Sequence, residues 1–116
     1  MNFQDDAPIV QKTYDLYKGF YELIDHFPKK SREVLINKIE VLILELLELL
    51  SSAEFSPAST KIQSLSQASI KLDFLKLLFR MTYEFKIINQ PKYLELEKHL
   101  QEIGKMLGGW IKSLRG

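Results

Sequence analysis

The sequence predicts an all-α protein, an up-down-up-down antiparallel four-helix bundle. Apolar residues recur at steps of three and four along most of the chain, which is the spacing of one helix face. Stops near Pro28, Pro57 and Pro91 divide the chain into four such segments. Short turns between long helices make successive helices antiparallel, so these observations favour a bundle.

The first helix is expected over about residues 9–27. Residues 1–7 are predicted to form a frayed tail, and Pro8 suits a first helical turn. Asp5 and Asp6 would lie beside the positive end of the helix dipole. Two adjoining apolar stripes form one broad face: Ile9, Leu16, Phe20, Leu23 and Phe27, and Val10, Tyr14, Tyr17, Tyr21 and Ile24. Pro28 ends this helix because proline cannot continue the hydrogen-bond ladder.

The second helix is expected over about residues 32–51, with Ser31 as its N-cap. Residues 39–50 are apolar except for Glu40, Glu45 and Glu48. Several β-branched residues make a buried strand the rival interpretation. The length of the run and its richness in Leu and Glu favour the helix.

The third helix is expected over about residues 60–89, after a serine-rich loop at 51–60. Its second half is apolar on three faces, one of which carries Phe74, Leu77, Met81 and Ile88. A helix in a small bundle normally keeps one solvated face. The excess apolar surface on the second and third helices therefore predicts an oligomer interface.

The fourth helix is expected over about residues 91–114, after a stop at 89–91. Its apolar stripe is the most regular in the chain: Tyr93, Leu96, Leu100, Ile103, Leu107, Trp110 and Leu114. This helix also contains three glycines, Gly104, Gly108 and Gly109. Each glycine destabilises a helix by about 1 kcal/mol relative to alanine. Gly104 and Gly108 share a face, so they indicate close helix contact, within the bundle or across an oligomer interface. The alternative is a frayed terminal turn, but Trp110 continues the apolar pattern beyond the glycines.

Length and composition suggest one domain, residues 1–116, in a cytoplasmic protein. The chain has 116 residues and no cysteine, which fits a reducing compartment. Its first residues are acidic and polar, unlike a signal peptide, and no apolar run reaches about 18 residues. We therefore expect no membrane span.

The sequence predicts no enzyme, metal site, cofactor or small-molecule substrate. Di-iron bundles place Glu three residues before each ligating His, whereas Leu23 and Leu96 precede His26 and His99. No nucleophile and base form a catalytic pattern, and no glycine-rich phosphate loop joins a strand to a helix.

Charge is distributed unevenly along the chain. Residues 1–58 carry six Lys and Arg against ten Asp and Glu, a net charge of −4, and residues 59–116 carry ten against five, or +5. The predicted topology gathers basic residues at one end: Lys29, Lys30, Arg32, Lys38, Lys76, Arg80, Lys86 and Lys92. These could bind phosphates, or they could pair with Asp73, Glu84 or Glu33.

Three stretches resemble the Avd-type proteins, the accessory variability determinants of diversity-generating retroelements. The most specific is the ending Gly104-Lys105-Met106-Leu107-Gly108-Gly109-Trp110-Ile111-Lys112. The stretch Phe27-Pro28-Lys29-Lys30-Ser31-Arg32, with Lys38-Ile39 and residues 46–50, resembles the family's first turn and second helix. Residues 68–73, with Lys76 and Arg80, resemble its third helix. The resemblance covers about residues 13–114.

The resemblance implies a non-enzymatic four-helix bundle that assembles as a homopentamer. Such proteins bind the retroelement's reverse transcriptase and its template RNA or DNA, and they support mutagenic copying of a template repeat. The family's basic surface would correspond here to Arg32, Lys38, Lys76 and Arg80, and Lys112 matches the ending. Packing or oligomer contacts are expected at Phe74, Leu77, Met81, Gly104, Gly108 and Trp110. The net charge of +1 departs from the strongly basic family pattern.

A second group is also similar: the four-helix bundle proteins encoded in intervening sequences of large-subunit ribosomal RNA genes. Membership there would imply a structural or protein-interaction bundle that does not bind nucleic acid. That group usually lacks the glycine- and tryptophan-containing ending.

Overall fold

The computed structural model describes residues 7–115, and they form four long helices with no strand. The long helices are α1 (Pro8–Leu23), α3 (Asn37–Phe55), α4 (Ala58–Glu84) and α5 (Gln90–Arg115). Three short helical segments link α1 to α3, namely η2 (Ile24–His26), α2 (Lys29–Ser31) and η3 (Arg32–Ile36). The all-α class predicted from the sequence is confirmed.

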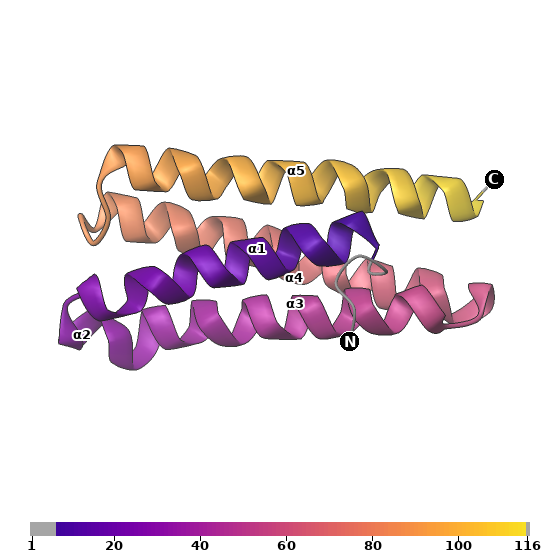
Figure 1. Ribbon diagram of the computed structural model, residues 1–116, viewed down its shortest axis with the longest axis horizontal. Coiled ribbons are helices and arrows are strands. Elements are labelled where there is room, and N and C mark those ends of the chain that lie inside the picture. The colour runs from indigo at the N-terminus through magenta and orange to yellow at the C-terminus, as the bar shows by residue number, and fades with distance from the viewer. Residues whose placement is uncertain (1–6, 116) are drawn as a thin grey trace.

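The long helices lie side by side in a body measuring 44 × 27 × 23 Å (Figure 1). Each packs against two others: α1 on α3 and α5, and α4 on α3 and α5. Figure 1 shows the α1–α3 link and the α4–α5 turn at one end, with the α3–α4 turn and the C-terminus at the other. This arrangement places α4 and α5 alongside each other over most of their lengths.

The core follows the apolar stripes of the four helices. Phe20 is fully buried between Phe27 and Phe79, with ring centroids 5.7 and 5.6 Å away. The α5 stripe is buried from Leu96 to Leu107, whereas its end residues are only partly buried. The stripes predicted for the first and fourth helices therefore identified most of the buried residues of α1 and α5, although Tyr21 of the α1 face is 62% exposed.

The start of the second predicted helix was wrong in detail. Helix α1 ends at Leu23, and a 3-10 turn precedes Pro28. Ser31 is not an N-cap, because helix formation already starts at Lys29, and its side chain makes no capping bond. The carbonyl of Pro28 instead accepts bonds from the backbone N–H groups of Ser31 and Arg32, at 3.0 and 3.2 Å.

The predicted loop at 51–60 was also wrong. Helix α3 continues to Phe55, since Ala53 extends its buried stripe, and only Ser56 and Pro57 separate it from α4. The hydroxyl of Ser56 donates to the carbonyl of Ser52 at 2.7 Å. Serines here complete a helix end rather than form a loop.

Helix α4 ends at Glu84, five residues before the predicted Asn89. Lys86 adopts a left-handed φ of 61°, and the N–H of Ile87 donates back to the carbonyl of Thr82 at 2.8 Å. This turn brings Ile88 into the core, 9% exposed. Asn89 then caps α5, because its side-chain oxygen accepts from the N–H of Lys92 at 3.0 Å.

Asp5 and Asp6, with the rest of the tail at 1–6, lie outside the described residues. Within residues 7–115, no helix combines the length and the apolarity that crossing a membrane requires.

Candidate functional site

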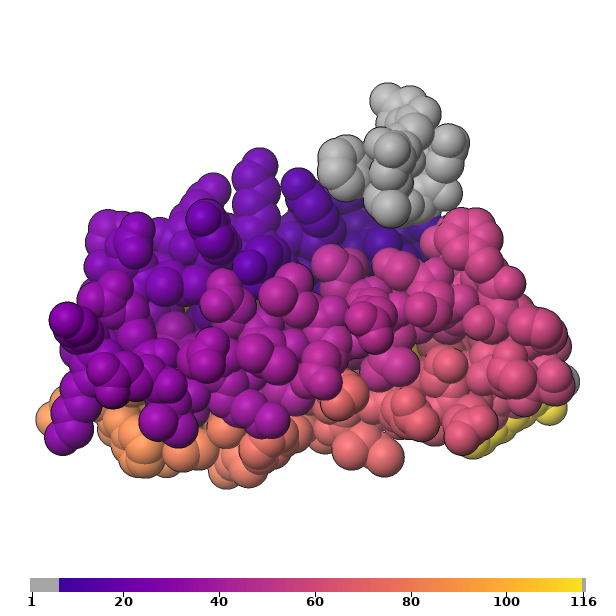
Figure 2. Space-filling view, turned by 90° about the horizontal axis from the view of Figure 1, so that it is seen from below, coloured from indigo at the N-terminus to yellow at the C-terminus, as the bar shows by residue number. Residues whose placement is uncertain are grey.

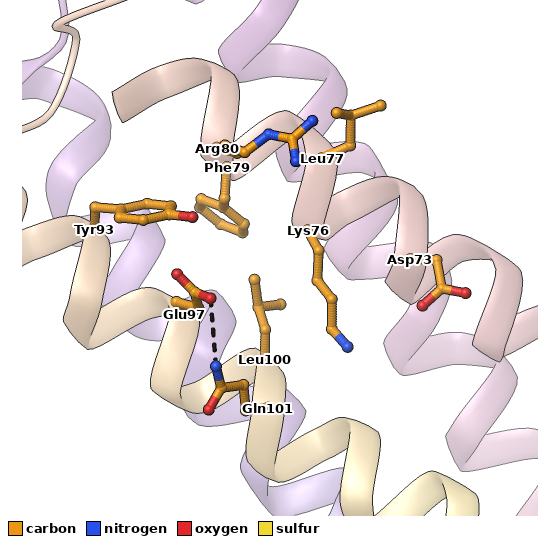
Figure 3. Close-up of a pocket in the computed structure, with 9 residues that line it drawn as sticks. All are labelled: Asp73, Lys76, Leu77, Phe79, Arg80, Tyr93, Glu97, Leu100 and Gln101. Atoms are coloured by element: carbon orange, nitrogen blue, oxygen red, sulfur yellow. Dashed lines mark hydrogen bonds between the residues drawn. The ribbon is translucent and has the colours of Figure 1, made fainter. Parts of the chain in front are cut away.

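A groove between α4 and α5 is the main hollowed surface that carries predicted site residues. It consists of two adjoining hollows of about 370 and 380 Å³ that share Asp73, Lys76 and Gln101. The first is also lined by Leu77, Phe79, Arg80, Tyr93, Glu97 and Leu100, and the second by Ser69, Leu72, Gly104, Lys105, Leu107 and Gly108. We call this surface the α4–α5 groove, and Figure 3 shows the residues that line its first hollow.

Helical spacing explains how the groove acquires its walls. Lys76 and Arg80 are four residues apart on α4, so they lie on one side of it, while Leu72, Leu75 and Phe79 face the core. On α5 the groove residues recur at steps of three and four: Tyr93, Glu97, Gln101, Gly104 and Gly108. Their stripe runs beside the buried stripe of the same helix.

Lys76 lies at the junction of the two hollows. Its side chain extends from α4 into the space beside α5, whereas Asp73 lies further along α4 (Figure 3). The side chain is half-buried, and no hydrogen bond or ion pair joins it to another residue among 7–115. A cation in such a position is available to an anionic ligand.

Most other charged groups at the first hollow already have partners. The carboxylate of Glu97 accepts from the side-chain amide of Gln101 at 3.3 Å, as Figure 3 shows. Arg80 Nε lies 3.6 Å from Glu84 Oε1, in an exposed pair. Burial raises the pKa of the Tyr93 hydroxyl, and the Glu97 carboxylate raises it further. The Tyr93 ring stacks on the Tyr83 ring, with the two ring centroids 4.9 Å apart.

The structure does not gather the five predicted nucleic-acid-binding residues into one cluster. Lys76 and Arg80 share a hollow, but exposed Lys38 lines a separate, mostly apolar hollow of about 540 Å³ that also contains Lys30. Arg32 lies 3.9 Å from Asp25, and its Nε is buried without a partner among the described residues. Lys112 is exposed in the last turn of α5, far along that helix from the first hollow.

Ion pairing accounts for part of the predicted basic end. Arg32 pairs with Asp25, Arg80 with Glu84, and Lys92 with Glu95 at 3.6 Å. The pairs of Arg80 and Lys92 are largely exposed, so each stabilises the fold weakly and leaves its cation within reach of other anions, whereas the Arg32 side chain is only 34% exposed.

The predicted packing residues divide into two groups. Phe74 and Leu77 are 43% and 41% exposed on α4, and Met81 is half-buried. Exposed apolar side chains also occur on the neighbouring segments: Val34 in η3, Val41 and Leu44 on α3, Ile70 on α4, and Phe85 just after α4. We call these eight residues the α3–α4 apolar surface. Figure 2 shows α3 crossing the middle of this side of the molecule, with α1 above it and α4 below.

The α5 residues of the packing set behave differently from one another. A Cβ at Gly104 would lie 3.4 Å from Lys76 Nζ, whereas a Cβ at Gly108 would meet nothing within 4 Å. Trp110 is half-buried, with Lys61 Nζ 5.7 Å from its ring centroid. The expected close contact is therefore absent around Gly108 within this single chain.

Metal ligation finds no support among residues 7–115, where no three His, Asp or Glu side chains converge. His26 is exposed, and His99 is half-buried with its Nδ1 lacking a hydrogen-bond partner among the described residues.

Sequence reasoning missed Tyr93, Glu97, Gln101 and Lys105 as groove residues. The signal was present in their spacing, since Tyr93, Glu97 and Gln101 are four apart on the side of α5 that carries Gly104. Their polar composition is that of a solvated helix face, which does not indicate a groove by itself.

A family model described as bAvd-like matches residues 8–114. No curated protein matches the chain.

Proposed function

This chain belongs to the bAvd-like family, and from that premise we propose that it is an accessory variability determinant of a diversity-generating retroelement. In this role it catalyses no reaction. It is a single-domain, up-down-up-down bundle that assembles with copies of itself, as a homopentamer in the family pattern. The assembly holds a reverse transcriptase and its template RNA or DNA together during mutagenic copying.

The observation that carries the proposal is the family match over residues 8–114. Two features of the chain support it. The unpaired ammonium of Lys76, one helical turn from Arg80, offers an anion a site in the α4–α5 groove. The exposed α3–α4 apolar surface offers an area for self-association. Symmetry would repeat a weak cationic site in every subunit, so avidity would offset the low net charge.

A gel-shift titration with a structured RNA at two salt concentrations tests the nucleic-acid role. We expect binding that weakens with salt, because phosphate contacts release counterions. Replacing Lys76 and Arg80 by Gln should weaken binding and reduce its salt dependence. Lys18→Gln on α1, an exposed lysine outside the groove, is the matched control and should bind like the parent protein. Binding that is absent or insensitive to salt would exclude this role.

The second candidate is a structural bundle of the ribosomal intervening-sequence type. The ion pairs of Arg32 with Asp25 and of Arg80 with Glu84 favour it, because each of these arginines already has an anionic partner within the chain. This candidate predicts self-association without RNA affinity, so the same titration distinguishes the two.

A further inference from the structure

Gly104 leaves the space that the end of the Lys76 side chain uses. A Cβ built on Gly104 would lie 3.4 Å from Lys76 Nζ and 3.6 Å from a methyl group of Leu72. Alanine would fit there at ordinary contact distance, but its methyl group would lie against the ammonium. A larger side chain would occupy the volume of the second hollow, where Gly104 forms part of the wall.

Among residues 7–115 this ammonium has no hydrogen-bond or ion-pair partner. Glu97, the carboxylate of the first hollow on α5, accepts a bond from Gln101. Asp73 lines both hollows but makes no ion pair with Lys76. A half-buried ammonium that has lost part of its hydration gains more from an anion than a fully exposed one does.

Cations follow one another along the groove. Arg80 lines only the first hollow, Lys76 lines both, and Lys105 lines only the second. This order, Arg80, Lys76, Lys105, suits a ligand that repeats its negative charge along a chain. A phosphodiester backbone has that property, whereas a single carboxylate or phosphate does not repeat its charge along a chain.

The geometry points to a phosphodiester-binding site in the α4–α5 groove, centred on Lys76, in which Gly104 is the positioning residue that keeps the ammonium in the groove. The ligand is a single RNA strand passing Arg80, Lys76 and Lys105 in turn. This assignment rests on the proposed nucleic-acid function and gives that function a location and a strand path.

A salt-dependence series with a uridine oligonucleotide tests the site. We compare the parent protein with Lys76→Gln, Gly104→Leu and the double variant. Loss of one phosphate contact should lower the slope of log affinity against log salt by about 0.7 for a single strand. We expect Lys76→Gln and Gly104→Leu each to show this loss, and the double variant to show no more than Lys76→Gln alone.

Gly109→Leu is the matched control, since Gly109 lies on the same helix, has nothing within 4 Å of its Cβ position and does not line the groove. It should keep the parent slope. Gly104→Ala covers the case in which Gly104→Leu fails to fold, because alanine fits, and it should weaken binding less than leucine. Equal slopes for the parent protein, Lys76→Gln and Gly104→Ala would overturn the site while leaving RNA binding elsewhere intact.

A second measurement separates the site from the proposed function. Inorganic tripolyphosphate is titrated into the protein while the backbone amide resonances of Gly104 and Gly108 are followed by NMR. Shifts that Lys76→Gln abolishes would support the site even if no RNA bound, in which case the nucleic-acid function alone would fail. Absence of these shifts would overturn the phosphodiester assignment. It would also be overturned if polyglutamate shifted the two resonances and tripolyphosphate did not.

Discussion

At the scale of single residues, the ion pair between Lys12 and Glu102 ties α1 to α5. Its atoms Nζ and Oε2 are 2.9 Å apart, and both side chains are about one-third exposed. The hydrogen bond from Lys12 holds the pKa of the Glu102 carboxyl below its ordinary value, against the opposing effect of burial. The same bond raises the pKa of Lys12. The pair therefore links fold stability to pH.

Glu102→Gln should lower the melting temperature at neutral pH and have little effect in acid. Because the pKa of Glu102 is lowered in the folded state, the ion pair stabilises the fold at pH values above the unfolded-state pKa of about 4.3. This stabilisation is lost as pH falls through the folded-state pKa. Because the pKa of Lys12 is raised, deprotonation of Lys12 removes the stabilisation by the ion pair only at alkaline pH, above about 10. Circular dichroism melts from pH 3 to 8 measure the difference. Glu48→Gln, which changes an exposed α3 residue, is the control. A difference in melting temperature between the parent protein and Glu102→Gln that stays constant down to pH 3 would contradict the link between this ion pair and pH.

Residue-level prediction from the sequence succeeded where periodicity governs and failed where packing does. The helical spacing of Leu16, Phe20 and Leu100 was sufficient to assign them to the core, and all three are buried. The same spacing predicted close helix contact at both Gly104 and Gly108, yet only Gly104 has Lys76 beside it. The relative register of α4 and α5 decides such contacts, and a one-dimensional pattern does not encode that register.

At the scale of elements, α5 combines a strong core stripe with glycines that weaken the helix. Gly108 and Gly109 lie inside α5, are exposed and have nothing within 4 Å of their Cβ positions. Glycine at such positions costs backbone entropy without a compensating contact in this chain. Their cost can therefore be measured directly.

Gly109→Ala should stabilise the isolated chain by up to about 1 kcal/mol, the difference in helix propensity. Urea unfolding followed by circular dichroism measures the gain. Gly104→Ala should gain less, because its methyl group would contact the Lys76 ammonium. Destabilisation by Gly109→Ala would mean instead that the backbone at 109 packs closely against another subunit.

The helices themselves were predictable, but their ends were not. Hydrophobic periodicity identified all four long helices. Their limits depend on individual bonds, such as the return of the Ile87 N–H to Thr82 and the capping of α5 by Asn89. Lys86 adopts a positive φ without being glycine or asparagine, so no composition rule identifies that turn.

At the scale of the whole molecule, the charges and the exposed apolar side chains occupy different surfaces. The α4–α5 groove holds Lys76, Arg80 and Lys105, and the α3–α4 apolar surface shares with it only Leu77, which lines the first hollow. Self-association through the residues of this surface other than Leu77 would leave Lys76, Arg80 and Lys105 accessible. A neutral protein could therefore present several cationic grooves in one assembly.

Phe74→Asp should weaken self-association without unfolding the chain. Phe74 is 43% exposed, so removing its ring costs the bundle little, while an aspartate within an apolar interface would be desolvated. Losing the burial of about half an aromatic side chain costs roughly 1 kcal/mol per interface, which makes the contact about fivefold weaker. Sedimentation velocity across a concentration series measures this shift, with Tyr21→Asp on α1, 62% exposed, as the control. If the parent protein sediments as a monomer at micromolar concentration, the α3–α4 apolar surface does not mediate assembly. The pentamer would then have to be abandoned, whatever the RNA titrations give.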